Sequence, residues 1–453
     1  MSYSVITYNQ ITDPEDRKTV DFLRTVAERV KMLLEDANVT RYTCSIGRSL
    51  NNEFNVDGGI FSIFRTQFTD GLSLTCYIGK KKGSASISSS ITDDENIVSA
   101  VNDAIAAAKA AEDDPAWVVA PKEENKIFVS GTLSFDKDVL FDRTTELMDT
   151  LKADFPSIMM EQAVTNHSRG VSLYFNSSGT EFISLTGAYG ADFIYSAHDG
   201  DNSSSFMASG FTLKDLDKPF IKTGFLEDSL KEVEKQVYTK SFSGKKVGKL
   251  IAAPALVDEL LSSALENFAD DYSILNGTSI WIDSLGKKVA DDRLTISFKT
   301  NDDIFVGGQW FSSEGYLTED YNIIDKGILT NFDISAYTAN KSGFRRAPNS
   351  GSNVIIEKGC KSIEEIIKET DFGIYVARFS GGAPSISGDF SGVAKNSFLI
   401  EKGRLTYALS ETMISGNLAE LLNNIVDISE EQELDGANAI PYICFDGVTV
   451  SGE

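Results

Sequence analysis

The sequence predicts an α+β protein of two domains: an N-terminal mixed α/β sheet domain and a C-terminal strand-rich domain with packed helices. With 453 residues, the chain is too long for one ordinary hydrophobic core. Stretches with the two-residue alternation of strands lie between segments with helical periodicity. A short stretch rich in Gly and Lys at 241–248 suits a linker. We therefore assign residues 1–240 and 249–453 to the two domains.

Capping patterns locate the helices of the first domain. Asp13 can cap a first helix, with Pro14 at its first position. Thr92 and Glu95 form a capping-box pattern before an Ala-rich helix, and Asp136 opens a third helix. These three helices are expected to end near residues 38, 111 and 156. The remaining elements are expected to be a helix at 225–238 and strands at 42–50, 59–69, 72–79, 83–90, 171–175, 181–185, 192–197 and 205–211.

The second domain is predicted to open with a strand at 249–253. Pro254 then begins a helix whose apolar residues recur on one face as far as Phe268. Ser362 and Glu365 form a capping box for a short helix that ends at residue 368. The C-terminal part is predicted to contain strands at 373–379, 393–401 and 404–414, with a two-residue hairpin loop at Lys402-Gly403 and a helix capped by Asn417.

Charge and composition exclude several classes of protein. The net charge of −25 opposes binding to a phosphate backbone, which requires clustered Lys and Arg. No stretch has the ~18 consecutive apolar residues of a membrane span, and the N-terminus has no apolar signal region. The cysteines are far apart and form no CxxC pair, so we expect small buried thiols in a reducing compartment. They are Cys44, Cys76, Cys360 and Cys444. We expect a cytoplasmic protein with no nucleic-acid or membrane partner.

The C-terminal stretch carries a series of motifs in a specific order. These are FGIYV, SGDFS, FLIEKGRLTYAL and TMISGNLAELLNNI, between residues 372 and 425. Together they resemble the C-terminal domain of the TldD/PmbA (TldE) family, and weaker likeness continues through nearly the whole chain. The resemblance implies a cytosolic, two-domain subunit of a peptide-cleaving complex. Proteins of this family were once described as modulators of DNA gyrase, a role that the acidic composition does not support.

The same resemblance identifies where a metal motif would lie. Active TldD-type members carry a His-Glu-x-x-x-His helix, in which two imidazoles hold zinc and the glutamate is the general base. The corresponding helix here is the one that begins at Pro254. Asp258 and Ser263 stand at the histidine positions, and only Glu259 remains of the motif. Serine cannot match imidazole as a zinc donor, so we predict no catalytic metal in this chain.

Other candidate groups have plain structural roles as alternatives. His167 and His198 are the only histidines, and we expect both to be partly exposed on strands. Glu259 is a minor catalytic candidate, and a surface position opposite the apolar stripe is favoured for it. Cys444 is expected to pack in a strand. Trp310 and the adjacent Phe311 are expected to be buried aromatics, with a peptide-pocket wall as the alternative.

The SGDFS segment is the predicted lining of a peptide channel. Its Gly residues leave room for another backbone to approach, and extended peptides bind by strand addition. Asp389 is also a minor catalytic candidate, although a turn-forming role is favoured. The channel residues that we predict are Ser385, Ser387, Gly388, Asp389 and Phe390.

Three hypotheses of function follow. The leading one is a TldE/PmbA-like subunit without catalysis of its own, paired with a TldD-type zinc metallopeptidase that acts on unfolded or flexible peptides. The second is a stand-alone homodimeric protein that binds peptides. The third is a metallopeptidase with noncanonical ligands, such as Asp258, Glu259 or the two histidines. Only the third requires a metal in this chain; in the first, zinc is expected in the partner.

Overall fold

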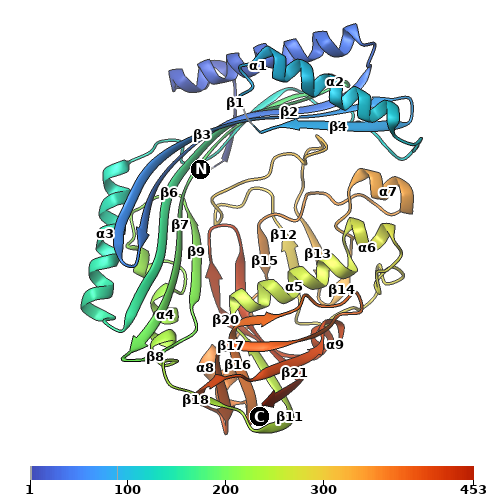
Figure 1. Ribbon diagram of the computed structural model, residues 1–453. Coiled ribbons are helices and arrows are strands. Elements are labelled where there is room, and N and C mark those ends of the chain that lie inside the picture. Colours follow the sequence, from blue (N-terminus) through green and yellow to red (C-terminus); the bar gives the residue numbers. More distant parts are fainter. Residues whose placement is uncertain (1–2, 89, 453) are drawn as a thin grey trace.

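Two large sheets, one from each half of the chain, organise the structure, and a computed structural model describes residues 3–88 and 90–452 (Figure 1). The first sheet has nine strands and the second has twelve. Figure 1 shows the first sheet arching over the second half of the molecule, with helices on its outer face. The predicted α+β class is confirmed, because helices and both antiparallel and parallel strand pairs are present.

The first sheet has the strand order β1-β5-β7-β6-β2-β3-β4, and β9 also pairs with β7. Its strands are β1 (Tyr3–Ile6), β2 (Arg41–Asp57), β3 (Ile60–Ile78), β4 (Lys81–Ile87), β5 (Lys126–Gly131), β6 (Ile158–Asn176), β7 (Glu181–Asp199), β8 (Asn202–Ser203) and β9 (Met207–Leu213). The helices of this half are α1 (Pro14–Asp36), α2 (Asp94–Ala110), α3 (Lys137–Asp154) and α4 (Leu226–Glu234), with 3₁₀ turns at Tyr8–Gln10 and Phe220–Lys222.

Helix starts largely follow the predicted caps. The Asp13 side chain accepts from the Glu15 amide at the start of α1, and Asp136 does the same for α3. The predicted cap of α2 was wrong by one residue: Asp93, not Thr92, accepts from the backbone there. Asp is as good a cap as Thr, so the pattern alone could not choose between neighbours.

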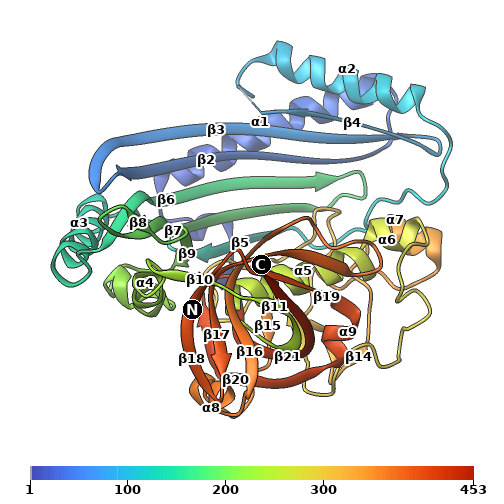
Figure 2. The ribbon, with the colours of Figure 1, turned by 60° about the horizontal axis from the view of Figure 1, so that its bottom comes forward.

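The strands of the first sheet are much longer than predicted. The expected strands at 59–69 and 72–79 are one strand, β3, because Gly71 pairs with Gly47 without a break. Alternation then puts the two faces of β2 in different environments. Cys44 and Ile46 are buried beneath α1 and α2, whereas Ser45 and Ser49 point to the opposite, concave face. That concave face is polar and faces the second half of the chain (Figure 2).

The second sheet begins earlier than expected. It contains β10 (Thr239–Ser241) and β11 (Gly244–Ala252), so most of the predicted linker at 241–248 is strand. Residues 244–248 pair with the C-terminal strand, β21 (Ala439–Gly452). The side chains of Lys245 and Lys246 are exposed, which explains why this part of the strand resembles a polar linker in the sequence.

The remaining elements pack around the central helix α5 (Pro254–Phe268), whose apolar face lies in the largest core cluster. The other helices are α6 (Asp271–Leu275), α7 (Ala336–Ser342), α8 (Ile363–Lys368) and α9 (Leu418–Asn423). The other strands are β12 (Ile296–Phe298), β13 (Tyr321–Asp325), β14 (Ile328–Leu329), β15 (Val354–Ile356), β16 (Phe372–Gly381), β17 (Asp389–Glu401), β18 (Arg404–Ser410), β19 (Met413–Asn417) and β20 (Ile425–Leu434).

The hairpin at Lys402-Gly403 is confirmed, with φ of 51° and 75° as a tight two-residue turn requires. The strand predicted at 404–414 is two strands, β18 and β19, because Glu411 turns the chain with a φ of 47°. The helix capped by Asn417, α9, ends at Asn423, and the chain enters β20 at Ile425. No helix in the described residues has the length and apolarity needed to cross a bilayer.

Candidate functional site

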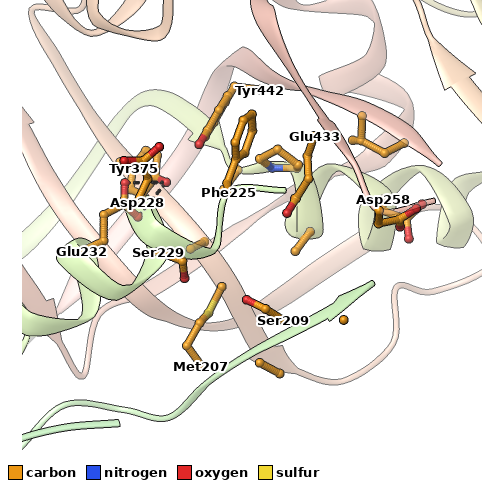
Figure 3. A pocket seen from close by; sticks show the side chains of 18 residues that line it. Met207, Ser209, Phe225, Asp228, Ser229, Glu232, Asp258, Tyr375, Glu433 and Tyr442 are labelled. Atoms are coloured by element: carbon orange, nitrogen blue, oxygen red, sulfur yellow. Dashed lines mark hydrogen bonds between the residues drawn. The ribbon is translucent and has the colours of Figure 1, made fainter. Parts of the chain in front are cut away.

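A cavity of about 230 Å³ lies where the two halves of the chain meet (Figure 3). Strand β9 and helix α4 line it from the first half, and the start of α5 with β16, β20 and β21 lines it from the second. Five carboxyl groups contribute to its wall: Asp228, Glu232, Asp258, Glu433 and Asp435. The cavity is therefore acidic and draws its residues from distant parts of the sequence.

Glu232 of α4 is held by a tyrosine of the other domain. The buried Tyr375 hydroxyl donates to the two carboxylate oxygens of Glu232 at 3.1 and 3.0 Å. Burial raises the pKa of Glu232 to about 7, and the hydrogen bond from Tyr375 opposes that rise. The ring of Tyr442 stacks on Phe225 with centroids 5.7 Å apart, which closes the same side of the cavity. Glu232 is consequently poised to change charge near neutral pH.

Two further carboxyl groups face the same space. Burial also raises the pKa of Glu433 to about 7, with a smaller contribution from the nearby Asp435. Burial raises the pKa of Asp258 as well, and Asp435 adds to the effect. Near neutrality such carboxyls either donate a hydrogen bond or accept one, depending on protonation. Near neutral pH the cavity wall therefore offers both donors and acceptors of hydrogen bonds.

Strand β9 presents a free edge to this cavity. The Thr212 amide points away from β7 and donates to the Asp435 carbonyl at 2.7 Å. Because backbone groups alternate along a strand, Ala208 and Gly210 point the same way. In the described residues these two have no backbone partner on that side, and both line the cavity. An extended chain placed there would find unpaired backbone groups to bind.

A second cavity, of about 420 Å³, continues along the polar concave face of the first sheet. It is lined by Asn166, Ser168 and Gly190 of β6 and β7, and it shares Gly210 and Asp435 with the first cavity. The two spaces thus adjoin along β9. Together they form a path from the concave sheet face to the start of α5.

Asp258, Glu259 and Ser263, which occupy the positions of the family's zinc motif, point in different directions from helix α5. Asp258 is half-buried and faces the cavity, whereas Glu259 is exposed as expected. Ser263, five residues after Asp258, lies about 140° around the helix and does not line the cavity. The donor set does not fit zinc, because it offers neither nitrogen nor thiolate. Within residues 3–88 and 90–452, no three His, Cys, Asp or Glu side chains are grouped to hold a metal ion.

The histidines lie in the first sheet and neither lines the cavity beside Asp258. The expectation for His167 was wrong: its side chain is buried, with Nε2 2.8 Å from the Thr132 carbonyl. It sits on the face of β6 that α3 covers, so it belongs to the core. His198 is exposed, as predicted, with Nε2 2.8 Å from the Ser196 hydroxyl.

The thiols are all free, and three are buried as expected. Cys360 is exposed, contrary to our expectation, because it lies in a loop before α8. Burial raises the pKa of Cys444 to about 12, which suits a packing role. Trp310 stacks on Phe128 of the first sheet with ring centroids 4.9 Å apart, and Phe311 packs in the same cluster. These half-buried aromatics join the two halves.

The SGDFS segment, which is predicted to line a peptide channel, lies away from the two cavities along β9. Ser385, Ser387 and Asp389 form a closed set of hydrogen bonds, and Asn417 donates to Asp389 at 3.0 Å. A Cβ on Gly388 would be 2.9 Å from the Phe268 ring at the far end of α5. That end is ten residues, or about 15 Å, from Asp258. None of the predicted channel residues, which include the buried Phe390, lines either cavity along β9.

Comparison with known proteins places this architecture. The model of the PmbA/TldA metallopeptidase C-terminal domain matches residues 244–452, and that of PmbA/TldA metallopeptidase domain 1 matches residues 44–108. The chain belongs to the PmbA/TldD family. The C-terminal match begins at the first residue of β11, in agreement with the earlier start of the second sheet.

Relatives of this PmbA/TldD-family chain align over most of its length. Metalloprotease PmbA of Escherichia coli O157:H7 is 28% identical over 410 residues, which are 87% of this chain and 85% of the relative. A PmbA homolog of Haemophilus influenzae is 25% identical over 424 residues, 88% of this chain and 90% of that protein. The crystal structure of TldE from Thermococcus kodakarensis shares the fold, with a TM-score of 0.79 and 20% identity over 96% of this chain and 100% of that one.

Proposed function

We propose that this PmbA/TldD-family chain is the TldE/PmbA-type subunit of a two-chain peptidase. In this proposal the zinc and the general base belong to a TldD-type partner, and this chain holds an unfolded or flexible peptide. The observation that carries the proposal is the pairing of a family fold with an α5 helix that has Asp258 and Ser263 in place of two imidazoles. Oxygen donors alone make a poor zinc site, so hydrolysis would require a second chain.

The contribution of this chain to peptide binding is assigned to β9. The unpaired backbone at Ala208 and Gly210 favours strand addition there rather than at the SGDFS segment, which is already closed by its own hydrogen bonds. The adjoining polar sheet face extends the path over the second cavity. Because backbone pairing does not depend on side chains, peptides of many sequences could bind along this path. A subunit that takes part in general proteolysis or peptide maturation needs this breadth.

The proposal is tested by copurification and elemental analysis. Tagged chain from its source cell is expected to recover a family member with a His-Glu-x-x-x-His motif, and the purified single chain is expected to contain no stoichiometric zinc. Persistent homodimers that ignore such a partner in native mass spectrometry would favour the stand-alone peptide-binding protein. Stoichiometric zinc that is lost on Glu259→Ala would favour noncanonical ligation.

A further inference from the structure

The cavity between the two domains carries negative charge that no cation of its wall balances. Five carboxyl groups line it, and its lining contains no Lys, Arg or His. In the part of the chain that the structure describes, only Asp228 of these five has an ion pair, 3.6 Å from the Lys231 ammonium. Charge gathered in a partly enclosed space is costly unless a counter-charge binds there. The four carboxyls without an ion pair are Glu232, Asp258, Glu433 and Asp435.

Neutral groups donate hydrogen bonds to three of these four carboxyls but do not cancel their charge. The donors are the Tyr375 hydroxyl for Glu232, the Phe225 amide for Glu433 and two backbone amides for Asp435. Asp258 differs from them. Within residues 3–88 and 90–452 it has neither an ion pair nor a hydrogen-bond donor, although its side chain is half-buried. Such a carboxylate is uncommon in native proteins, which indicates that a ligand supplies the donor.

The cavity has the size and the walls for one long side chain. Its volume of about 230 Å³ is smaller than the ~300–1,000 Å³ of sites for drug-sized ligands. The stacked rings of Phe225 and Tyr442 give it an apolar surface. In Figure 3, Phe225 lies between Glu232 on one side and Glu433 with Asp258 on the other. Lys and Arg side chains are buried in such surroundings, with the carbon stem on apolar surface and the charge at a polar group.

The unpaired edge of β9 is an independent sign of a peptide ligand. Ala208 and Gly210 line the cavity, and in the described residues their backbone groups on the side away from β7 have no partner. Successive side chains of a strand added there would point to opposite faces of the sheet. On one face the Tyr195 hydroxyl joins Ser209 of β9 to Ser229 of α4, and both serines line the cavity. Every second side chain of the peptide would therefore point towards the cavity.

We propose that the cavity binds the basic side chain of a peptide held on β9, so that this chain selects segments that contain Lys or Arg. This inference rests on the proposed function, because it names the class of peptide that the β9 path retains. Backbone pairing along β9 supplies affinity for any sequence. The acidic cavity sets the register of the bound peptide by capturing one positive charge, and it repels a peptide side chain that is acidic.

Protons compete with a basic side chain for the carboxyls of the cavity. Burial raises the pKa of Glu232 and of Glu433 to about 7, so both gain negative charge as the pH rises through neutrality. A basic peptide should therefore bind more tightly at about pH 8 than at about pH 6. The other titratable groups beside these two carboxyls are Tyr195, Asp228, Lys235, Tyr375, Asp435 and Tyr442. Burial keeps the three tyrosines neutral in this range.

The test measures binding of fluorescent peptides to the full chain by anisotropy. The probe is an unstructured peptide of about twelve residues with one central Lys, acetylated at its N-terminus and amidated at its C-terminus. Two comparison peptides carry norleucine, which has the carbon chain of Lys without the charge, or Glu at that position. At about pH 8 we expect the Lys peptide to bind at least about tenfold more tightly than the norleucine peptide, and the Glu peptide to bind most weakly. At about pH 6 the advantage of Lys should fall by at least about threefold.

A pair of variants assigns the selectivity to the cavity. Asp258→Asn/Glu433→Gln removes two charges with little change of shape, and it should reduce the advantage of Lys over norleucine to less than about threefold. The control Asp154→Asn/Glu430→Gln removes the same charge from two exposed positions and should leave the advantage unchanged. Circular dichroism verifies that both variants fold.

Each outcome bears on a different part of the inference. Equal affinities of the Lys and norleucine peptides for the wild-type chain overturn the basic-side-chain site and leave the proposed function intact. An equal advantage of Lys in the cavity variant and the control overturns the choice of cavity. A gain seen only when the peptide N-terminus is a free amine overturns the choice of a side chain and assigns the cavity to the peptide's end. Absence of binding by all the peptides overturns this inference together with the peptide path along β9.

Discussion

Tyr375 of β16 donates a hydrogen bond to Glu232 of α4, at 3.0 Å, and this contact joins the second domain to the first across the cavity. Sequence separation hides the pair, since the two residues are 143 positions apart. Glu232 and the free edge of β9 line the same cavity, so the charge of Glu232 affects how strongly a ligand binds there. If this cavity holds peptide, as we propose, peptide binding should therefore depend on pH.

Replacing Glu232 by Gln should change the pH dependence of stability. The folded-state pKa is about 7 and the ordinary value is 4.5, so folding takes up a proton between these values. Wild-type stability therefore falls as pH rises from 4.5 to 7. Glu232→Gln should be more stable than wild type by about 1–2 kcal/mol at pH 8 and equal to it near pH 4.5, after allowance for partial solvent screening. Urea denaturation at both pH values measures this.

Glu433→Gln should change the pH dependence of stability in the same way as Glu232→Gln, because burial raises the pKa of Glu433 to about 7 as well. The exposed Glu430→Gln is the matched control for removing one negative charge from an acidic chain. A stability difference that is independent of pH in the Glu232 and Glu433 variants would show that neither carboxyl is buried as described.

Gly436 holds the turn that meets β9, with a φ of 91°. A Cβ at this position would be 1.8 Å from the Thr212 carbonyl oxygen. Gly436→Ala should therefore cost about 3 kcal/mol or more, from backbone strain and from separation of the two domains. Gly447 has a φ of 93° but only Asn424 near its Cβ position, so Gly447→Ala should cost about 1 kcal/mol. Thermal denaturation that ranks the two alike would contradict the close contact.

The Ala208 amide is expected to bind peptide backbone. Ala208→Pro removes this N–H without breaking the ladder to β7, so it should weaken binding of an unfolded fluorescent peptide by about tenfold and leave the fold intact. Ala208→Ser retains the amide and should bind nearly as wild type. Fluorescence anisotropy distinguishes them, and equal affinities would remove β9 from the peptide path.

A stack at the other end of the molecule also joins the domains. The Tyr337 ring lies 3.7 Å from that of Trp117, and its hydroxyl donates to Asp114 at 2.8 Å. Tyr337→Ala should cost about 2 kcal/mol and speed proteolysis between the domains, whereas Tyr337→Phe should cost less than about 1 kcal/mol. Similar losses in the two variants would mean that the hydrogen bond, not the stack, carries the contact.

Helix caps and tight turns could be predicted from the sequence, because they are determined by the few residues that form them. Asp13, Ser362 and Asn417 were correctly predicted as helix caps, and the Lys402-Gly403 turn follows from the positive φ that both positions adopt. Strand length was underestimated, because Gly and polar residues on an exposed sheet face look like loops. The prediction of a linker at 241–248 was wrong for the same reason, because most of this polar stretch is an exposed strand.

The cavity could not be predicted from the sequence. Glu232, Tyr375 and Glu433 are on three different elements, and no spacing connects them. Asp258 was identified only because it occupies a motif position, and the structure adds that it faces the cavity while Ser263 does not. The glycines of the SGDFS segment predict room for another backbone, but in the structure Gly388 packs closely against Phe268.

We propose that this chain binds peptide but depends on a second chain for hydrolysis. The most direct measurement is cleavage of a denatured peptide by the purified chain, by its His-Glu-x-x-x-His-bearing relative, and by the two mixed. We predict no turnover by this chain alone and faster turnover by the mixture than by the relative alone. Turnover by the single chain, abolished by Glu259→Ala, would contradict the account.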